Sequence, residues 1–284
     1  DVVLELIGGE DGVAKAVCEN AIAAGRHVVT ANKALLAIHG RALAVAAETA
    51  GVGLGYEAAV AGGIPVIKAL REGFAGNRIS SIHGILNGTC NYILTTMRET
   101  GRDFDDVLAE AQELGYAEAD PTFDVDGIDA AHKLALLASV AFGTEVDFGS
   151  VHVEGIRHVS AEDIAFAEEL GFRIKLLGIA NQTSDGIEQR VYPCMVPLTA
   201  PLAHVEGVFN AVVAEGDAVG TSVLQGRGAG AGPTASAVIS DIADIARGTI
   251  LPVFSVPASR LKAARTVSIE NRVGPYYVRL TVLD

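Results

Sequence analysis

The chain has 284 residues, enough to bury a large core and to form two interlocked domains. Half of the residues are hydrophobic, and the formal net charge of −14 argues against nucleic acid and anionic membranes as partners. The 3 cysteines are scattered, and no signal peptide or membrane-length apolar run occurs, so we expect a protein of the reducing cytosol. The chain opens with DVVLELIGG, without a methionine, and we expect that residues of the natural protein precede Asp1.

The first fifty residues predict half of a doubly wound nucleotide-binding fold. Residues 2–7 form an apolar run ended by two glycines, which is typical of a buried parallel strand. A helix is expected over residues 12–24, a second buried strand over 27–31, and an alanine-rich helix from Lys33 to about Ala50. This strand–helix–strand–helix order is the repeating unit of that fold.

Gly8, Gly9 and Lys33 follow the carboxyl ends of these two strands, where open α/β sheets bind their ligands. A lysine at a helix N-terminus opposes the macrodipole, so a nearby anionic ligand would explain Lys33; the alternative is a solvated helix start. The dinucleotide fingerprint GxGxxG does not occur here, and the later glycine-rich stretch 226–233 does not fit its spacing.

The next segment predicts two strands with a loop between them. Residues 52–57 read as a strand that ends at Glu57, and the small residues 58–63 leave backbone carbonyls accessible beside this acid. Such a loop could bind a hard cation, although an ordinary loop is the alternative. Residues 79–86 form a second strand, followed by the turn Asn87-Gly88-Thr89 and a helix, a pattern that a simple helix cap also produces.

An acidic helix over residues 103–114 leads into the segment GYAEADPTFDVDGIDAAHK, residues 115–133. Pro121 argues against a helix in its first half. The sequence DVDG is similar to part of a calcium loop, but that alignment places Lys133 where a bidentate glutamate is required, which excludes it. The segment's acids are Glu118, Asp120, Asp124, Asp126 and Asp129.

Asp129 and Lys133 are four residues apart on a helix that continues into the uncharged run LALLASVAF. Leu136, Leu137 and Val140 follow on the same face, so this face is expected to point toward protein. A lysine there needs a partner and has a tunable pKa, which makes Lys133 a candidate proton donor or acceptor. The alternative is an ordinary surface pair.

The downstream chain predicts a second, α+β domain. A helix over 161–170 precedes strand patterns at 174–181 and 187–196, and with 52–57 and 79–86 these strands predict a mixed sheet.

A glycine-rich turn then leads to Pro233 and a helix to about Arg247. Free amides there could approach a phosphate or cofactor; close packing of a crossover helix is the alternative. Residues 276–284 alternate as a strand.

The segment 115–133 resembles the signature of homoserine dehydrogenase, and the resemblance covers nearly the whole chain. It implies reversible NAD(P)-linked reduction of L-aspartate 4-semialdehyde to L-homoserine, in threonine, methionine and isoleucine biosynthesis, by a cytoplasmic homodimer or homotetramer. The implied fold is α/β, with a partial Rossmann-type nucleotide-binding domain at 1–52 and 225–256 whose first strand and fingerprint lie upstream. A catalytic and dimerisation domain with a mixed sheet spans 53–224, and 257–284 is a linker and the start of a truncated ACT regulatory domain.

Four sets of residues are therefore expected to have roles, the first from the chemistry of the residues and the other three with the resemblance as support. Lys133, oriented by Asp129, is expected to protonate the carbonyl oxygen, with Lys33 as the rival for that role. The substrate contacts are Glu118, Asp124, Tyr116 and Thr89. Gly230 joins Gly8, Gly9 and Lys33 as a cofactor contact, for NADP or NAD. The ligands of a sodium ion are Glu57, through its side chain, and the carbonyls of Val60, Gly62 and Ile64.

Two other functions remain open on the sequence. A different NAD(P)-linked dehydrogenase of amino-acid metabolism would share the nucleotide-binding half but not the full pattern of residues 115–133. A non-catalytic amino-acid sensor would keep Glu118 and have no need of Lys133 or a cofactor.

Overall fold

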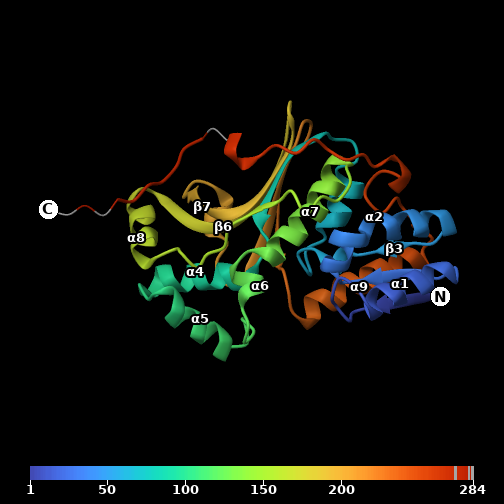
Figure 1. Cartoon of the computed structure of the whole chain (residues 1–284), viewed down its shortest axis with the longest axis horizontal. Helices are drawn as coiled ribbons and strands as arrows, with labels where there is room; N and C mark the ends of the chain where they lie inside the picture. The colour runs from blue at the N-terminus through green and yellow to red at the C-terminus, as the bar shows by residue number, and fades with distance from the viewer. Residues whose placement is uncertain (272–273, 281, 283–284) are drawn as a thin grey trace.

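The computed structural model describes residues 1–271, 274–280 and 282. Two sheets lie side by side, with α7 (Ile128–Phe142) running between them (Figure 1). This arrangement confirms the expected α/β class, with a small parallel sheet and a larger mixed one. None of the helices in the described part of the chain is both long and apolar enough to span a membrane.

The first sheet is parallel and three-stranded, in the order β1-β2-β3. Its strands are β1 (Val2–Glu5), β2 (His27–Thr30) and β3 (Leu54–Gly55), connected by α1 (Val13–Ala23) and α2 (Lys33–Ala50). The apolar faces of these helices pack on the sheet, as the periodicity predicts. The late helix α9 (Ala231–Ala246) returns to pack against β2 and β3, so distant parts of the sequence build this half.

The assignment of 52–57 to the mixed sheet was wrong. β3 pairs in parallel with β2, where Val28 lies opposite Leu54. The reason is connectivity, because a strand that follows strand and helix returns most readily to the same sheet beside its predecessor.

The second sheet has six strands in the order β5-β7-β6-β4-β8-β9. It is mixed because β5 pairs in parallel with β7, whereas its other pairs are antiparallel. The hairpin of β8 and β9 was not predicted. The six strands are β4 (Ile79–Ile85), β5 (His152–Val153), β6 (Phe172–Thr183), β7 (Gly186–Pro197), β8 (Phe209–Gly216) and β9 (Gly220–Arg227).

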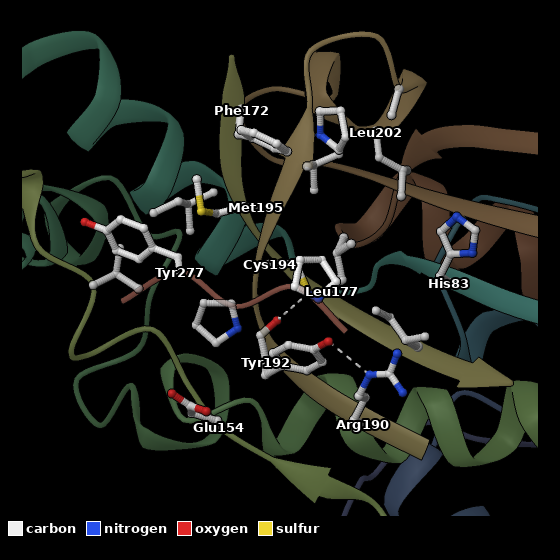
Figure 2. Close-up of a pocket in the computed structure, with 18 of the residues that line it drawn as sticks. His83, Glu154, Phe172, Leu177, Arg190, Tyr192, Cys194, Met195, Leu202 and Tyr277 are labelled. Carbon is white, nitrogen blue, oxygen red and sulfur yellow. Dashed lines mark hydrogen bonds between the residues drawn. The ribbon is translucent and has the colours of Figure 1, made fainter. Parts of the chain in front are cut away.

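The helices α4 (Gly88–Thr100) and α7 cover one face of this sheet (Figure 1). Between α4 and α7 the chain forms α5 (Phe104–Glu113) and α6 (Thr122–Val125), and α8 (Ala161–Glu169) follows α7. The opposite face carries an open groove lined by side chains such as Leu177, Tyr192 and Cys194, with Tyr277 of the C-terminal segment against it (Figure 2). Because side chains alternate along a strand, this groove and the two helices lie on opposite faces.

Two local expectations are corrected by the structure. Pro121 was expected to exclude a helix, but α6 begins immediately after it, because proline's missing N–H and fixed φ suit the start of a helix. The expected terminal strand is absent from described residues 276–280, while residues 281, 283 and 284 lie outside the described residues.

Candidate active site

Asp129 and Lys133 form a buried ion pair on α7, as their spacing predicts. The Lys133 ammonium donates to Asp129 Oδ2 at 2.7 Å and to the carbonyl of Leu86, the residue after β4, at 2.8 Å. Both residues are buried, with 8% of Lys133 and 4% of Asp129 exposed. The pair is therefore not a solvated surface pair.

Lys33 completes the arrangement from the other half of the molecule. It is the first residue of α2, and its Nζ lies 3.0 Å from Oδ1 of Asp129. One carboxylate thus lies between two ammonium groups. Burial by itself would raise the pKa of Asp129, but the charges of Lys133 and Lys33 outweigh it and hold that pKa well below its usual range.

Asn87 is a site residue that sequence reasoning missed. Its Nδ2 donates to Asp124 Oδ1 and to Asp129 Oδ2, each at 2.8 Å, while its Oδ1 accepts from the amide of Cys90 and caps α4. Burial raises the pKa of Asp124, and the hydrogen bond from Asn87 opposes that rise. The Asn-Gly-Thr turn indicated the cap, but no local signal pointed to the two distant carboxylates.

The remaining expected substrate contacts divide into two groups. Thr89 and Tyr116 are brought together, since Thr89 Oγ1 donates to the carbonyl of Tyr116 at 2.6 Å. The ring of Tyr116 packs against Tyr92, with centroids 4.8 Å apart. Glu118 is exposed on the loop before α6, and its backbone carbonyl accepts from Gln112.

The loop after β1 is fixed by a buried carboxylate. Glu5 Oε1 accepts from the amides of Ile7 (2.7 Å) and Gly8 (3.2 Å), and Oε2 accepts from Thr30 Oγ1 at 2.6 Å. Asn32 Nδ2 donates to the carbonyl of Gly9 at 2.7 Å. The glycine loop is therefore held at the carboxyl ends of β1 and β2, where the sequence predicts a cofactor.

Gly230 precedes the first residue of α9, with φ of 107°. Its positive φ favours glycine at this helix start.

An aromatic cluster, also missed, lies beside Lys33. The Lys33 ammonium is 5.7 Å from the ring centroid of Phe123, and His132 packs between Phe123 and Phe148. Burial lowers the pKa of His132, which favours a neutral imidazole next to the two lysines.

The expected sodium loop has features that fit a hard cation. Glu57 is buried, and its two oxygens accept from the amides of Ile67 and Lys68, each at 2.8 Å. Burial raises the pKa of Glu57 to about 7. The carbonyls of Val60 and Gly62 accept no hydrogen bond from any residue that the structure describes.

Gly62 is fixed as glycine by its surroundings, because φ is 53° and an added Cβ would lie 2.3 Å from the carbonyl oxygen of Gly228. Ile64 differs from Val60 and Gly62, since its carbonyl accepts from Val66 at 2.7 Å. Within residues 1–271, 274–280 and 282, no cluster of three or more His, Cys, Asp or Glu could hold a metal ion.

Comparison with known proteins identifies the family. The family model described as homoserine dehydrogenase matches residues 65–243. The homoserine dehydrogenases of Pseudomonas aeruginosa and Synechocystis sp. are 50% and 54% identical over 290 and 294 residues; each match covers 100% of this chain and 67% of the relative. The chain thus spans about two thirds of the length of these curated relatives.

Solved structures of homoserine dehydrogenases have the same fold as this chain. A homoserine dehydrogenase from Thiobacillus denitrificans superposes with a TM-score of 0.91 at 52% identity, over 95% of this chain and 64% of that one. A hyperthermophilic archaeal homoserine dehydrogenase in complex with NADPH gives a TM-score of 0.76 at 31% identity, over 87% of this chain and 72% of that one. Its sequence and its fold together place the chain in the homoserine dehydrogenase family.

Proposed function

We propose that the chain forms the catalytic part of a homoserine dehydrogenase, which interconverts L-aspartate 4-semialdehyde and L-homoserine with NAD(P). The observation that carries this proposal is the placement of Lys133 and Lys33 on the two oxygens of buried Asp129. Family membership supports the reaction, and the geometry supplies candidate groups for its proton chemistry.

Reduction of an aldehyde requires a hydride and a proton for the developing alkoxide. The nicotinamide cofactor, when bound, supplies the hydride. Lys133 is our candidate for the proton donor, because Asp129 and the Leu86 carbonyl fix its ammonium in one orientation. Lys33 remains the rival donor; in either case two ammonium groups stabilise negative charge on the carbonyl oxygen. In the reverse direction the same lysine accepts the hydroxyl proton of homoserine.

The acids of the site suit an amino-acid substrate. Asp124 accepts a hydrogen bond from Asn87 and is affected by the charges of Lys133 and Lys33, so it is a candidate partner for the substrate ammonium. We propose Glu118, Tyr116 and Thr89 as further substrate contacts; Thr89, at the start of α4, is bonded to the loop that carries the other two.

We propose that Gly8, Gly9, Lys33 and Gly230 contact the cofactor. The support is the rigid loop held by Glu5 and the return of α9 to the parallel sheet. The archaeal relative was solved with NADPH, so NADP is one candidate and NAD the other.

We propose a sodium ion in the loop after β3. Its ligands would be the Glu57 carboxylate and the carbonyls of Val60, Gly62 and Ile64. Oxygen ligands suit a hard cation, and two of these carbonyls are without a described donor. The ion would stabilise the loop between the two sheets.

The broader organisation is also proposed. Residues 1–52 and 225–256 would form the nucleotide-binding domain, 53–224 the catalytic domain, and 257–284 a linker and the start of an ACT regulatory domain. A cytoplasmic homodimer or homotetramer is expected, and sedimentation equilibrium would distinguish these states from a monomer.

The test is homoserine-dependent reduction of NAD⁺ and NADP⁺ by the whole gene product. Clear turnover would establish the reaction, and the ratio of kcat/KM values would give the cofactor preference. Turnover of another amino-acid substrate instead would indicate a different dehydrogenase. Tight homoserine binding without cofactor binding would indicate a sensor.

A further inference from the structure

Asn87 lies between the two carboxylates at the centre of the candidate site. The two hydrogens of its Nδ2 are donated to different acids, Asp124 Oδ1 and Asp129 Oδ2, over equal distances of 2.8 Å. Asn87 is buried, with 5% of its surface exposed, so water does not replace these donors readily.

The helix α4 fixes which atom of the amide faces the acids. Asn87 Oδ1 accepts from the amide of Cys90 at 2.8 Å, so the NH₂ group must point the other way. The reversed amide would place its oxygen against two carboxylates and its NH₂ against an N–H group. The helix start is itself packed closely, since a Cβ on Gly88 would meet the carbonyl of Val208 at 2.8 Å.

The two acids have different surroundings. Asp129 contacts both Lys33 and Lys133, whereas Asp124 has Asn87 as its close side-chain donor. The groups that act on Asp124 are Asn87 from the start of α4, Asp129 and Lys133 from α7, and Lys33 from α2. The thiol of Cys90 donates to the Asp124 backbone carbonyl, which connects α4 to α6. Without the amide, Asp124 and Asp129 would compete for the same lysines.

We propose that Asn87 is a positioning residue that keeps Asp124 and Asp129 apart in fixed orientations. Asp129 then remains with the two lysines that serve proton transfer, and Asp124 remains available to the ammonium of the substrate. This inference rests on the proposed function for the role of the ammonium, but the separation of the acids can be measured without turnover.

The discriminating variant is Asn87→Ser. Serine still caps α4 through its oxygen, but its single, short O–H cannot reach both carboxylates. We expect the pH at which Asp124 takes up its proton to rise, measured by ¹³C NMR of labelled aspartate carboxyls and assigned with Asp124→Asn. In the active enzyme, KM for homoserine should rise about 10-fold or more, because a hydrogen bond to a charged group is lost, and most strongly at low pH. The fall in kcat should be smaller.

Ser160→Ala is the matched control, since it removes the capping box of α8, and the Ser160 side chain bonds to Asp163 and not to Asn87, Asp124 or Asp129. It should cost stability without moving the titration of Asp124. An Asp124 titration in Asn87→Ser equal to that of the wild type would overturn the inference, whatever the change in stability. If the wild-type protein does not oxidise homoserine, the proposed function fails, and the carboxyl titration still decides the role of Asn87.

Discussion

Lys33 lies 3.0 Å from Asp129 although the two residues come from different halves of the molecule. Lys33 is the first residue of α2, where the helix dipole disfavours a cation. The position of Lys33 therefore predicts an anion nearby, and from the sequence that anion is expected to be a bound ligand. The anion in the structure is Asp129 of the chain itself, so this ion pair joins the glycine loop side of the site to α7.

Lys133→Ala should lower kcat by about 10²–10⁴-fold, because a proton-transfer group is removed while Lys33 still compensates Asp129. Steady-state kinetics with homoserine and NADP⁺ or NAD⁺ measure the effect, and circular dichroism checks the fold. Lys15→Ala is the matched control, since Lys15 forms an exposed pair with Asp11 in the same i,i+4 spacing. Near-normal turnover of Lys133→Ala would remove Lys133 from the chemistry.

Asp129→Asn should destabilise the protein by about 3–5 kcal/mol at neutral pH, because the buried ammonium of Lys133 and the partly buried ammonium of Lys33 lose their counter-charge. The folded state lowers the pKa of Asp129, so its stabilising contribution is present above the ordinary value of 3.8 and is lost as the pH falls below it. Urea unfolding should therefore show the two proteins converging in acid.

Asp11→Asn provides the comparison for this experiment, since Asp11 belongs to an exposed ion pair. Asp11→Asn should change the free energy of unfolding by no more than about 1 kcal/mol. If the free energies of unfolding of the wild type and Asp129→Asn differ by the same amount at every pH, the charge-based explanation is contradicted.

The proposed sodium site predicts a stabilisation that grows with pH. Burial raises the pKa of Glu57 to about 7, so a cation must displace a proton below that pH but binds an ionised carboxylate above it. Sodium chloride should therefore raise Tm relative to choline chloride. At a sodium concentration of a hundred times Kd, the free energy of unfolding should increase by about 2–3 kcal/mol. The increase should be larger above pH 7 than below it. Glu57→Gln should remove this pH dependence. Equal Tm values in both salts would argue against the ion.

The sequence predicts best what depends on local pattern. The strand–helix–strand start, the buried helix after Ile128 and the Asp129–Lys133 pair all follow from apolar periodicity and spacing. The short strand β3 carries too few residues for any pattern to show which sheet it joins. The contacts of Asn87 could not be predicted, because its partners lie 37 and 42 residues away and are brought near only by packing of α4 against α6 and of α6 against α7.

Lys175, on β6, is a buried charge that the sequence did not indicate. It is 2% exposed, and its ammonium donates to Asn91 Oδ1 at 3.0 Å and to the carbonyl of Val205 at 2.7 Å, with Glu206 at 3.4 Å. Burial lowers its pKa to about 8, against the attraction of Glu206. Lys175 lies under α4, the helix that Asn87 caps.

This depressed pKa predicts a gain in stability in mild alkali. Between about pH 8 and pH 10.5 the unfolded chain keeps the Lys175 proton that the folded chain has released, so the free energy of unfolding rises with pH. The wild-type protein should gain about 3 kcal/mol relative to Lys175→Met across this window, measured by urea unfolding at several pH values. Lys262→Met, which alters an exposed lysine, should show no such trend. If the difference in the free energy of unfolding between the wild type and Lys175→Met is the same at every pH, Lys175 keeps its proton on folding.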